Sequence, residues 1–161
     1  MPLFRDSLVT LLEKAEQIIP QAWLPELPPG DNTSGMPEWR DFETQLWEVG
    51  EEIRLILLTE KGLRQDEELQ NAFCRIACNR NAKNGRQPFF GLLGYTSCKR
   101  LAPLIAEQLD DHRVSGHVIS ALLKMKADGF APEIAPLKNS GKAWIRKKSK
   151  MYCERYPRRK L

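Results

Sequence analysis

The sequence has no long apolar run and no feature of a membrane protein. Among its 161 residues no stretch approaches the ~20 apolar residues that cross a bilayer, so no membrane partner is expected. Near the N-terminus, charged residues such as Arg5, Asp6 and Glu13 interrupt the apolar ones, unlike the uninterrupted core of a secretory signal. These absences lead us to expect a cytoplasmic protein.

Cysteine and histidine are too scattered to suggest a metal site. Of the 4 cysteines, Cys74 and Cys78 are spaced to share one face of a helix. A zinc site needs four ligands, usually with a closely spaced cysteine pair of the CxxC type. Neither that pair nor a matching histidine pattern is present, so we expect free thiols, no metal and no other cofactor.

The chain also lacks alternating strand patterns and a catalytic motif. Its apolar residues recur at three- and four-residue steps, which predicts an all-α fold. Asp110, Asp111, His112 and His117 could supply a histidine–carboxylate pair for acid–base catalysis. No nucleophile or glycine-rich anion loop accompanies them, so we predict that the protein is not an enzyme.

Charge is divided unevenly along the chain. Residues 1–70 hold 6 Lys or Arg and 15 Asp or Glu, a net charge of −9. Residues 71–161 hold 19 Lys or Arg and 6 Asp or Glu, a net charge of +13. Such asymmetry bears on partners and association rather than on fold. The two halves could attract each other internally, or they could present one acidic and one basic face.

The periodicity predicts a single helical domain over residues 1–161. Acidic helices occupy residues 1–65, helix pairs occupy 66–156, and a basic tail follows at 157–161. A Pro-rich loop over 20–37 separates the first two helices, and Trp23 and Leu24 are expected to pin it to the core. The predicted helices cover residues 3–19, 37–62, 66–80, 88–93, 99–109, 111–127, 132–139 and 142–156.

Two C-terminal segments repeat one pattern. The first begins LAPLIA at residue 101, and the second begins FAPEIA at residue 130, 29 residues later. Each leads into a second apolar segment, at 114–125 and at 144–152. A repeated helix pair cannot bury its apolar face alone, so neighbouring pairs must stack.

This pattern resembles the HEAT repeat, with an early Pro, a short acidic turn, and Val-Arg and Ala-Leu in the second helix. Val114 and Ala121-Leu122 stand at such positions in the first copy, and Ile145-Arg146 in the second. Ser115 departs from the pattern, as does a period shorter than the ~40–47 residues of HEAT units. The resemblance covers about 60 residues and implies a short α-solenoid of stacked antiparallel helix pairs. The rival fold is an irregular helical bundle.

Two charged helices are candidate docking surfaces. The C-terminal helix interleaves basic and aromatic residues, which suits a phosphate backbone or an acidic protein, although a terminal repeat is polar outside in any case. The resemblance adds two residues of helix 111–127, because second helices line the concave side of HEAT-like proteins. Helix 37–62 offers an acidic face. The candidate partner-binding residues are His117, Lys124, Lys142, Arg146, Lys147, Lys150, Arg155, Glu48, Glu51 and Glu52.

Small size, opposite charges and the lack of a catalytic motif favour a non-enzymatic, protein-binding helical-repeat protein. One concrete version is a bacterial toxin-immunity protein or inhibitor that occludes a toxin domain, since complementary charge favours fast and specific association. The alternative is nucleic-acid binding through the basic C-terminal helices, with an affinity that falls steeply with salt.

Overall fold

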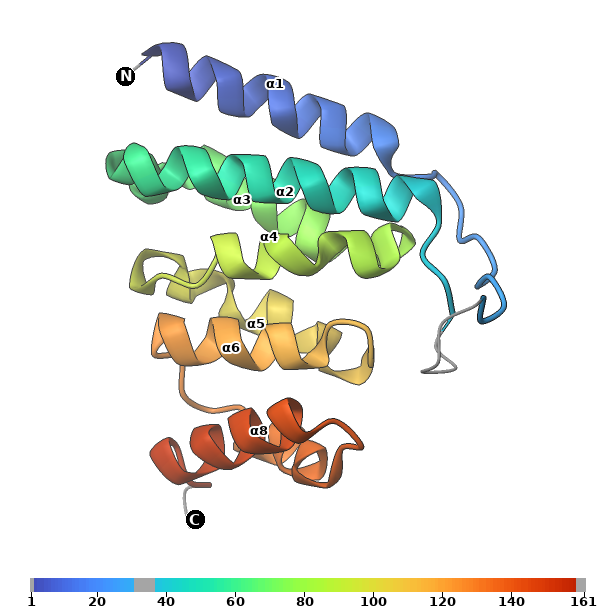
Figure 1. Ribbon diagram of the computed structural model, residues 1–161. Coiled ribbons are helices and arrows are strands. Elements are labelled where there is room, and N and C mark those ends of the chain that lie inside the picture. The colour runs from blue at the N-terminus through green and yellow to red at the C-terminus, as the bar shows by residue number, and fades with distance from the viewer. Residues whose placement is uncertain (1, 31–36, 159–161) are drawn as a thin grey trace. The chain divides into compact units, whose positions relative to one another are not determined.

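The computed structural model describes residues 2–30 and 37–158, and within them the chain forms helices and no strands (Figure 1). The predicted all-α class is confirmed. The α-helices are α1 (Pro2–Ile18), α2 (Asp41–Thr59), α3 (Glu67–Ala77), α4 (Gln87–Leu92), α5 (Ala102–Ala106), α6 (Ser115–Met125), α7 (Ala131–Ile134) and α8 (Ala143–Arg155).

Tighter 3-10 turns connect many of these helices. They are η1 (Lys61–Gln65), η2 (Arg80–Arg86), η3 (Thr96–Leu101), η4 (Glu107–Asp110) and η5 (Ala135–Asn139). Across the described part of the chain, no helix combines the length and apolarity that a membrane crossing requires. The chain folds as two compact units, Met1–Phe89 (unit 1) and Phe90–Leu161 (unit 2).

Unit 1 is built on three helices, α1, α2 and α3. Near the start of α1, Arg5 bonds Asp66, the N-cap of α3, at 2.8 Å. Near the end of α1, Glu16 lies 3.4 Å from Arg75, in the last turn of α3. Contacts at both ends mean that α1 and α3 run in the same direction. Helix α2 packs against α1 and η2 through an apolar face that includes Leu46.

Helix α2 is shorter than predicted at both ends. It begins at Asp41 rather than Pro37, because the Glu43 carboxylate reaches back to accept the Arg40 backbone N–H at 2.7 Å. This is the reciprocal half of a capping box, and it defines the first turn. At the other end the helix stops at Thr59 rather than Gly62, where the chain tightens into η1.

The predicted loop over 20–37 is non-helical at residues 20–30 and at Pro37, and its residues 31–36 lie outside the described part. Trp23 is 48% exposed, and its ring centroid lies 3.5 Å from Lys83 Nζ in a cation–π contact, while Leu24 is half-buried. The Pro20 carbonyl accepts from Asn81 Nδ2 at 3.2 Å, and the Pro25 carbonyl accepts from Arg40 Nε at 3.0 Å.

Unit 2 consists of two helical hairpins in succession. Helix α5 with η4 leads into α6, and α7 with η5 leads into α8, with each returning helix packed on its predecessor. At their starts α6 and α8 meet through His117 and Trp144, with ring centroids 5.3 Å apart. At their ends the Tyr152 hydroxyl donates to the Ala127 carbonyl at 2.6 Å. Helices α6 and α8 are therefore parallel and adjacent (Figure 1).

The boundaries of α6 differ from those predicted. Asp111 is not its N-cap: the carboxylate accepts the Arg113 N–H at 3.0 Å and shapes a turn, and α6 begins at Ser115. The helix ends at Met125 rather than Ala127, because Lys126 adopts a left-handed conformation with φ of 58°. Gly129, with φ of 100°, then bends the chain toward α7.

Candidate functional site

Helix α8 directs basic side chains to solvent while its apolar face enters the core of unit 2. Ile145, Ser149 and Tyr152 share one face and are buried. Lys147 and Lys150 lie on the opposite face and are exposed. Both ends of the helix are basic as well, because Lys142 precedes its first turn and Arg155 ends it, each exposed.

These cations are not neutralised within the fold. Lys142, Lys147, Lys150 and Arg155 form no ion pair with any other residue that the structure describes. An exposed lysine without a partner is fully hydrated and available to a charged ligand. We call Lys142, Lys147, Lys150 and Arg155, together with Lys124 of α6, the basic surface.

Arg146, which the sequence analysis assigns to the same site, has a structural contact. It is half-buried, and its Nη1 donates to the Ser140 carbonyl at 2.7 Å. This bond closes the turn that precedes α8. Arg146 therefore positions the helix, and its guanidinium is less available than the neighbouring lysines.

His117 and Lys124, the two other predicted basic site residues, lie on α6. They are seven residues apart and so share one face. Burial, followed by the nearby charge of Lys142, lowers the pKa of His117 below its ordinary value, which favours the neutral imidazole. Lys124 is exposed, and its aliphatic stem passes over Gly94. The structure thus brings His117 to Trp144 and Lys142 of the α8 region.

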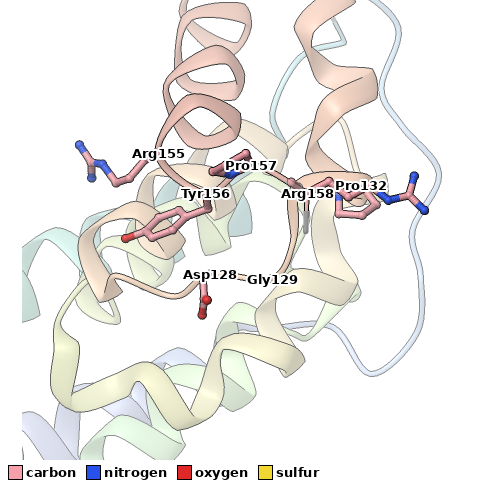
Figure 2. Close-up of a pocket in the computed structure, with 8 residues that line it drawn as sticks. Asp128, Gly129, Pro132, Arg155, Tyr156, Pro157 and Arg158 are labelled. Carbon is pink, nitrogen blue, oxygen red and sulfur yellow. The ribbon is translucent and has the colours of Figure 1, made fainter. Parts of the chain in front are cut away.

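A pocket with a volume of 680 Å³ opens at the C-terminal end of α8 (Figure 2). In this view Arg155 and Arg158 extend to opposite sides, and Asp128 lies below Tyr156. The Tyr156 ring is tilted against Tyr152 with centroids 5.1 Å apart. The pocket is lined by Asp128, Gly129, Ala131, Pro132, Arg155, Tyr156, Pro157 and Arg158.

The sequence analysis includes only Arg155 of these lining residues among the candidate site residues. The Asp128-Gly129 pair correctly predicts a turn. It does not predict that this turn lies beside the C-terminal end of α8. Tyr156 and Arg158 follow α8, and they join the pocket because the α6–α7 connection passes close to that helix end.

The predicted acidic residues lie on α2, in unit 1. Glu48 and Glu52 are exposed, and Glu51 accepts from Arg54 Nε at 2.8 Å one turn along the helix. The acidic and basic candidates therefore belong to different units.

The groups considered for catalysis or metal binding have local roles. The Asp111 carboxylate accepts from the Arg113 guanidinium at 3.3 Å as well as from its backbone. The sulfur atoms of Cys74 and Cys78 lie 3.8 Å apart, within hydrogen-bond distance, and are not joined in a disulfide. Among the described residues no group of three or more His, Cys, Asp or Glu is placed to hold a metal ion.

Comparison of the chain with profiles of known protein families, with curated proteins and with solved structures found no match.

Proposed function

We propose that this chain is a non-enzymatic, HEAT-like protein-binding module whose basic surface docks an acidic region of another protein. The observation that carries the proposal is the set of exposed cations without ion-pair partners on α8. Helix α8 packs against α6 and η5, and this packing sets the backbone positions from which the cations extend. Preorganised charge of this kind increases both association rate and specificity.

The arrangement of the hairpins supports the HEAT-like part of the proposal. In a stacked array the second helix of each pair follows the same direction as the second helix of the next pair. Helices α6 and α8 have this relation, with contacts at both their starts and their ends. Both helices carry exposed lysines, Lys124 on α6 and Lys147 and Lys150 on α8.

A protein partner explains the surface better than a nucleic acid. Glu154 is exposed on the same outward row as Lys147 and Lys150 and interrupts the positive charge. A protein surface can place a Lys or Arg opposite Glu154 among its acidic residues, which a uniformly anionic phosphate backbone cannot do. Trp144 is 43% exposed and is held edge-on by His117, which suits it as an anchor, since tryptophan is enriched at interface hot spots.

One specific role fits these properties, that of a bacterial immunity protein or inhibitor that acts in the cytoplasm. A toxin domain with an acidic patch near its active site would be occluded by unit 2 bound across that patch. The segregated charge of the chain supports this version, because such inhibitors must associate quickly with a single target.

The test is capture from a lysate of the organism that encodes the chain, with the tagged full-length protein. Lys147→Glu with Lys150→Glu reverses the centre of the basic surface, and Lys99→Glu with Lys138→Glu makes the same charge change at exposed lysines elsewhere in unit 2. We expect an acidic protein to be recovered by the wild type and the control but not by the first variant. Equal recovery by all three would contradict the proposal.

Nucleic-acid binding is the second candidate, favoured by the net charge of +9 in unit 2. It predicts that nuclease treatment of the lysate removes the captured material. It also predicts an affinity for DNA or RNA that decreases linearly with salt on a double-logarithmic plot. If no binding is measured even at low salt, this candidate fails.

A further inference from the structure

Helix α2 carries three large apolar residues that the core does not use. Its inner face, which includes Leu46, Ile53 and Leu57, is buried. On the outer side Trp47 is 37% exposed, Leu55 is 56% exposed and Leu58 is 48% exposed. Large apolar side chains gathered on one outward face, unlike isolated ones, are typical of a contact surface.

The three apolar residues form a row. Trp47, Leu55 and Leu58 are eight and three residues apart, spacings that return to the same side of a helix. The row runs along three helical turns, or roughly 16 Å. Glu51 lies within it, and its carboxylate is held toward Arg54. Glu48 and Glu52 flank the row on one side as exposed carboxylates.

We infer that this α2 face, defined by Trp47, Glu48, Glu51, Glu52, Leu55 and Leu58, binds a basic amphipathic helix of a partner protein. The surface lies in unit 1, so the inference goes beyond the proposed function and is independent of the basic surface. Two helices that pack side by side match apolar rows at 8–10 Å between axes. Flanking carboxylates then select Lys or Arg at the edge of the partner's apolar stripe.

Charge argues against the two other occupants of such a face. An anionic membrane surface attracts helices with basic polar faces and would repel Glu48 and Glu52. A second copy of this chain would have to offer its own basic helix, α8. The apolar stripe of α8 is already buried in unit 2, where Ile145 is 3% exposed and Tyr152 is fully buried.

Fluorescence polarisation with a labelled synthetic peptide tests the inference on the full chain. The probe is a helix of about 18 residues, roughly 27 Å long, composed of Leu at helical spacing and Lys elsewhere. A second peptide has Glu in place of every Lys. We expect the wild type to bind the Leu/Lys peptide and not the Leu/Glu peptide.

Two variants probe the two parts of the face. Leu55→Ser with Leu58→Ser removes apolar contact, and Glu48→Lys with Glu52→Lys reverses the flanking charge. Each should weaken binding about tenfold or more. The matched control, Asp6→Lys with Glu13→Lys, changes the same net charge at exposed residues of α1 and should stay within about twofold of wild type.

Three results would overturn the inference. The first is a control variant that weakens binding as much as Glu48→Lys with Glu52→Lys, which would indicate net charge alone. The second is a Leu55→Ser, Leu58→Ser variant that binds like the wild type. The third is a wild type that dimerises in sedimentation analysis and becomes monomeric in that serine variant. If circular dichroism shows that the serine variant is unfolded, the charge-reversal pair and its control decide the outcome.

Discussion

Unit 1 and unit 2 use their charged side chains in different ways. Unit 1 has 10 Lys or Arg and 15 Asp or Glu, and it forms ion pairs between helices, Arg5 with Asp66 and Arg75 with Glu16. Unit 2 has 15 Lys or Arg and 6 Asp or Glu, and an ion pair there, Arg113 with Asp111, lies within one turn. Ion pairs join helices in unit 1, whereas Lys147 and Lys150 of α8 in unit 2 face solvent.

The difference shows which feature orders each unit. The inter-helix contacts of unit 1 are supplemented by a buried carboxylate, that of Glu43, which is 2% exposed. Unit 2 is ordered by apolar packing and by buried polar groups that include the Tyr152 and Ser149 hydroxyls and the Asp111 carboxylate. Lys147 and Lys150 of α8 are exposed and take no part in these contacts, and this is why we propose that the basic surface binds a partner.

The largest effect is expected for Glu43→Ala in unit 1. The carboxylate accepts the Arg40 N–H at 2.7 Å, and both the N–H and Nδ2 of Asn84 at 3.0 Å. Its removal leaves these donors without an acceptor, and we expect a loss of about 3 kcal/mol in the free energy of unfolding. Urea denaturation measures it. Glu48→Ala, an exposed position on the same helix, should change stability by less than about 0.5 kcal/mol; similar losses for both would contradict the account of unit 1.

A smaller loss is expected for Tyr152→Phe in unit 2. The hydroxyl donates to the Ala127 carbonyl at 2.6 Å and accepts the Phe130 N–H at 3.2 Å, so the substitution leaves two buried backbone groups unsatisfied. We expect a loss of about 1–3 kcal/mol, measured by urea denaturation.

The same substitution changes the response to alkali. Burial raises the pKa of Tyr152 from 10.0 to about 12, so between these values the unfolded chain loses a proton that the folded chain keeps. Stability of the wild type should therefore decrease as the pH rises through this range, and Tyr152→Phe should remove that part of the decrease. An unchanged alkaline slope would indicate that the hydroxyl is not buried in solution.

The smallest expected effects are changes in stability with pH, which differ between the two units. Burial lowers the pKa of His117 from 6.5, so below this pH the unfolded chain binds a proton that the folded chain does not. Unit 2 should lose stability as the pH falls below 6.5. In unit 1 the bond to Arg5 lowers the pKa of Asp66 below 3.8. The stability that this bond contributes is therefore lost only when the pH falls below that value.

Hydrogen exchange measured separately for α6 and α3 checks this order. On acidification from pH 7.5 to about pH 5.5, protection in α6 should decrease more than protection in α3, and His117→Gln should abolish the difference. A larger decrease of protection in α3 than in α6 would contradict the expected order.

Much of the fold follows from apolar periodicity, and much of the site does not. The spacing of apolar residues located every α-helix and both hairpins of unit 2. It misplaced the start of α2, because Pro37-Glu38 resembles a first helical turn, whereas the helix begins at Asp41, with Glu43 accepting the Arg40 N–H. Asn84, 41 residues away, also donates to Glu43, and a contact at such sequence separation leaves no local signal.

Arg146 illustrates the same limit within the candidate site. Its spacing of four from Lys150 places both on neighbouring helical turns, and the sequence predicts two equivalent cations. Only the turn at Ser140 makes them different, since its carbonyl accepts from Arg146 and not from Lys150. The apolar pattern of α2 likewise identified the buried residues of the helix. The exposed row of Trp47, Leu55 and Leu58 was identified only from the exposed fractions of these side chains in the structure.

Lysine acetylation, quantified by mass spectrometry with and without the captured partner, tests the central claim most directly. The basic surface predicts that Lys147 and Lys150 are modified readily in the free protein and become protected in the complex, while Lys99 and Lys138 are modified equally in both. Protection of Lys99 and Lys138 with Lys147 and Lys150 unchanged would contradict the assignment of the site to α8.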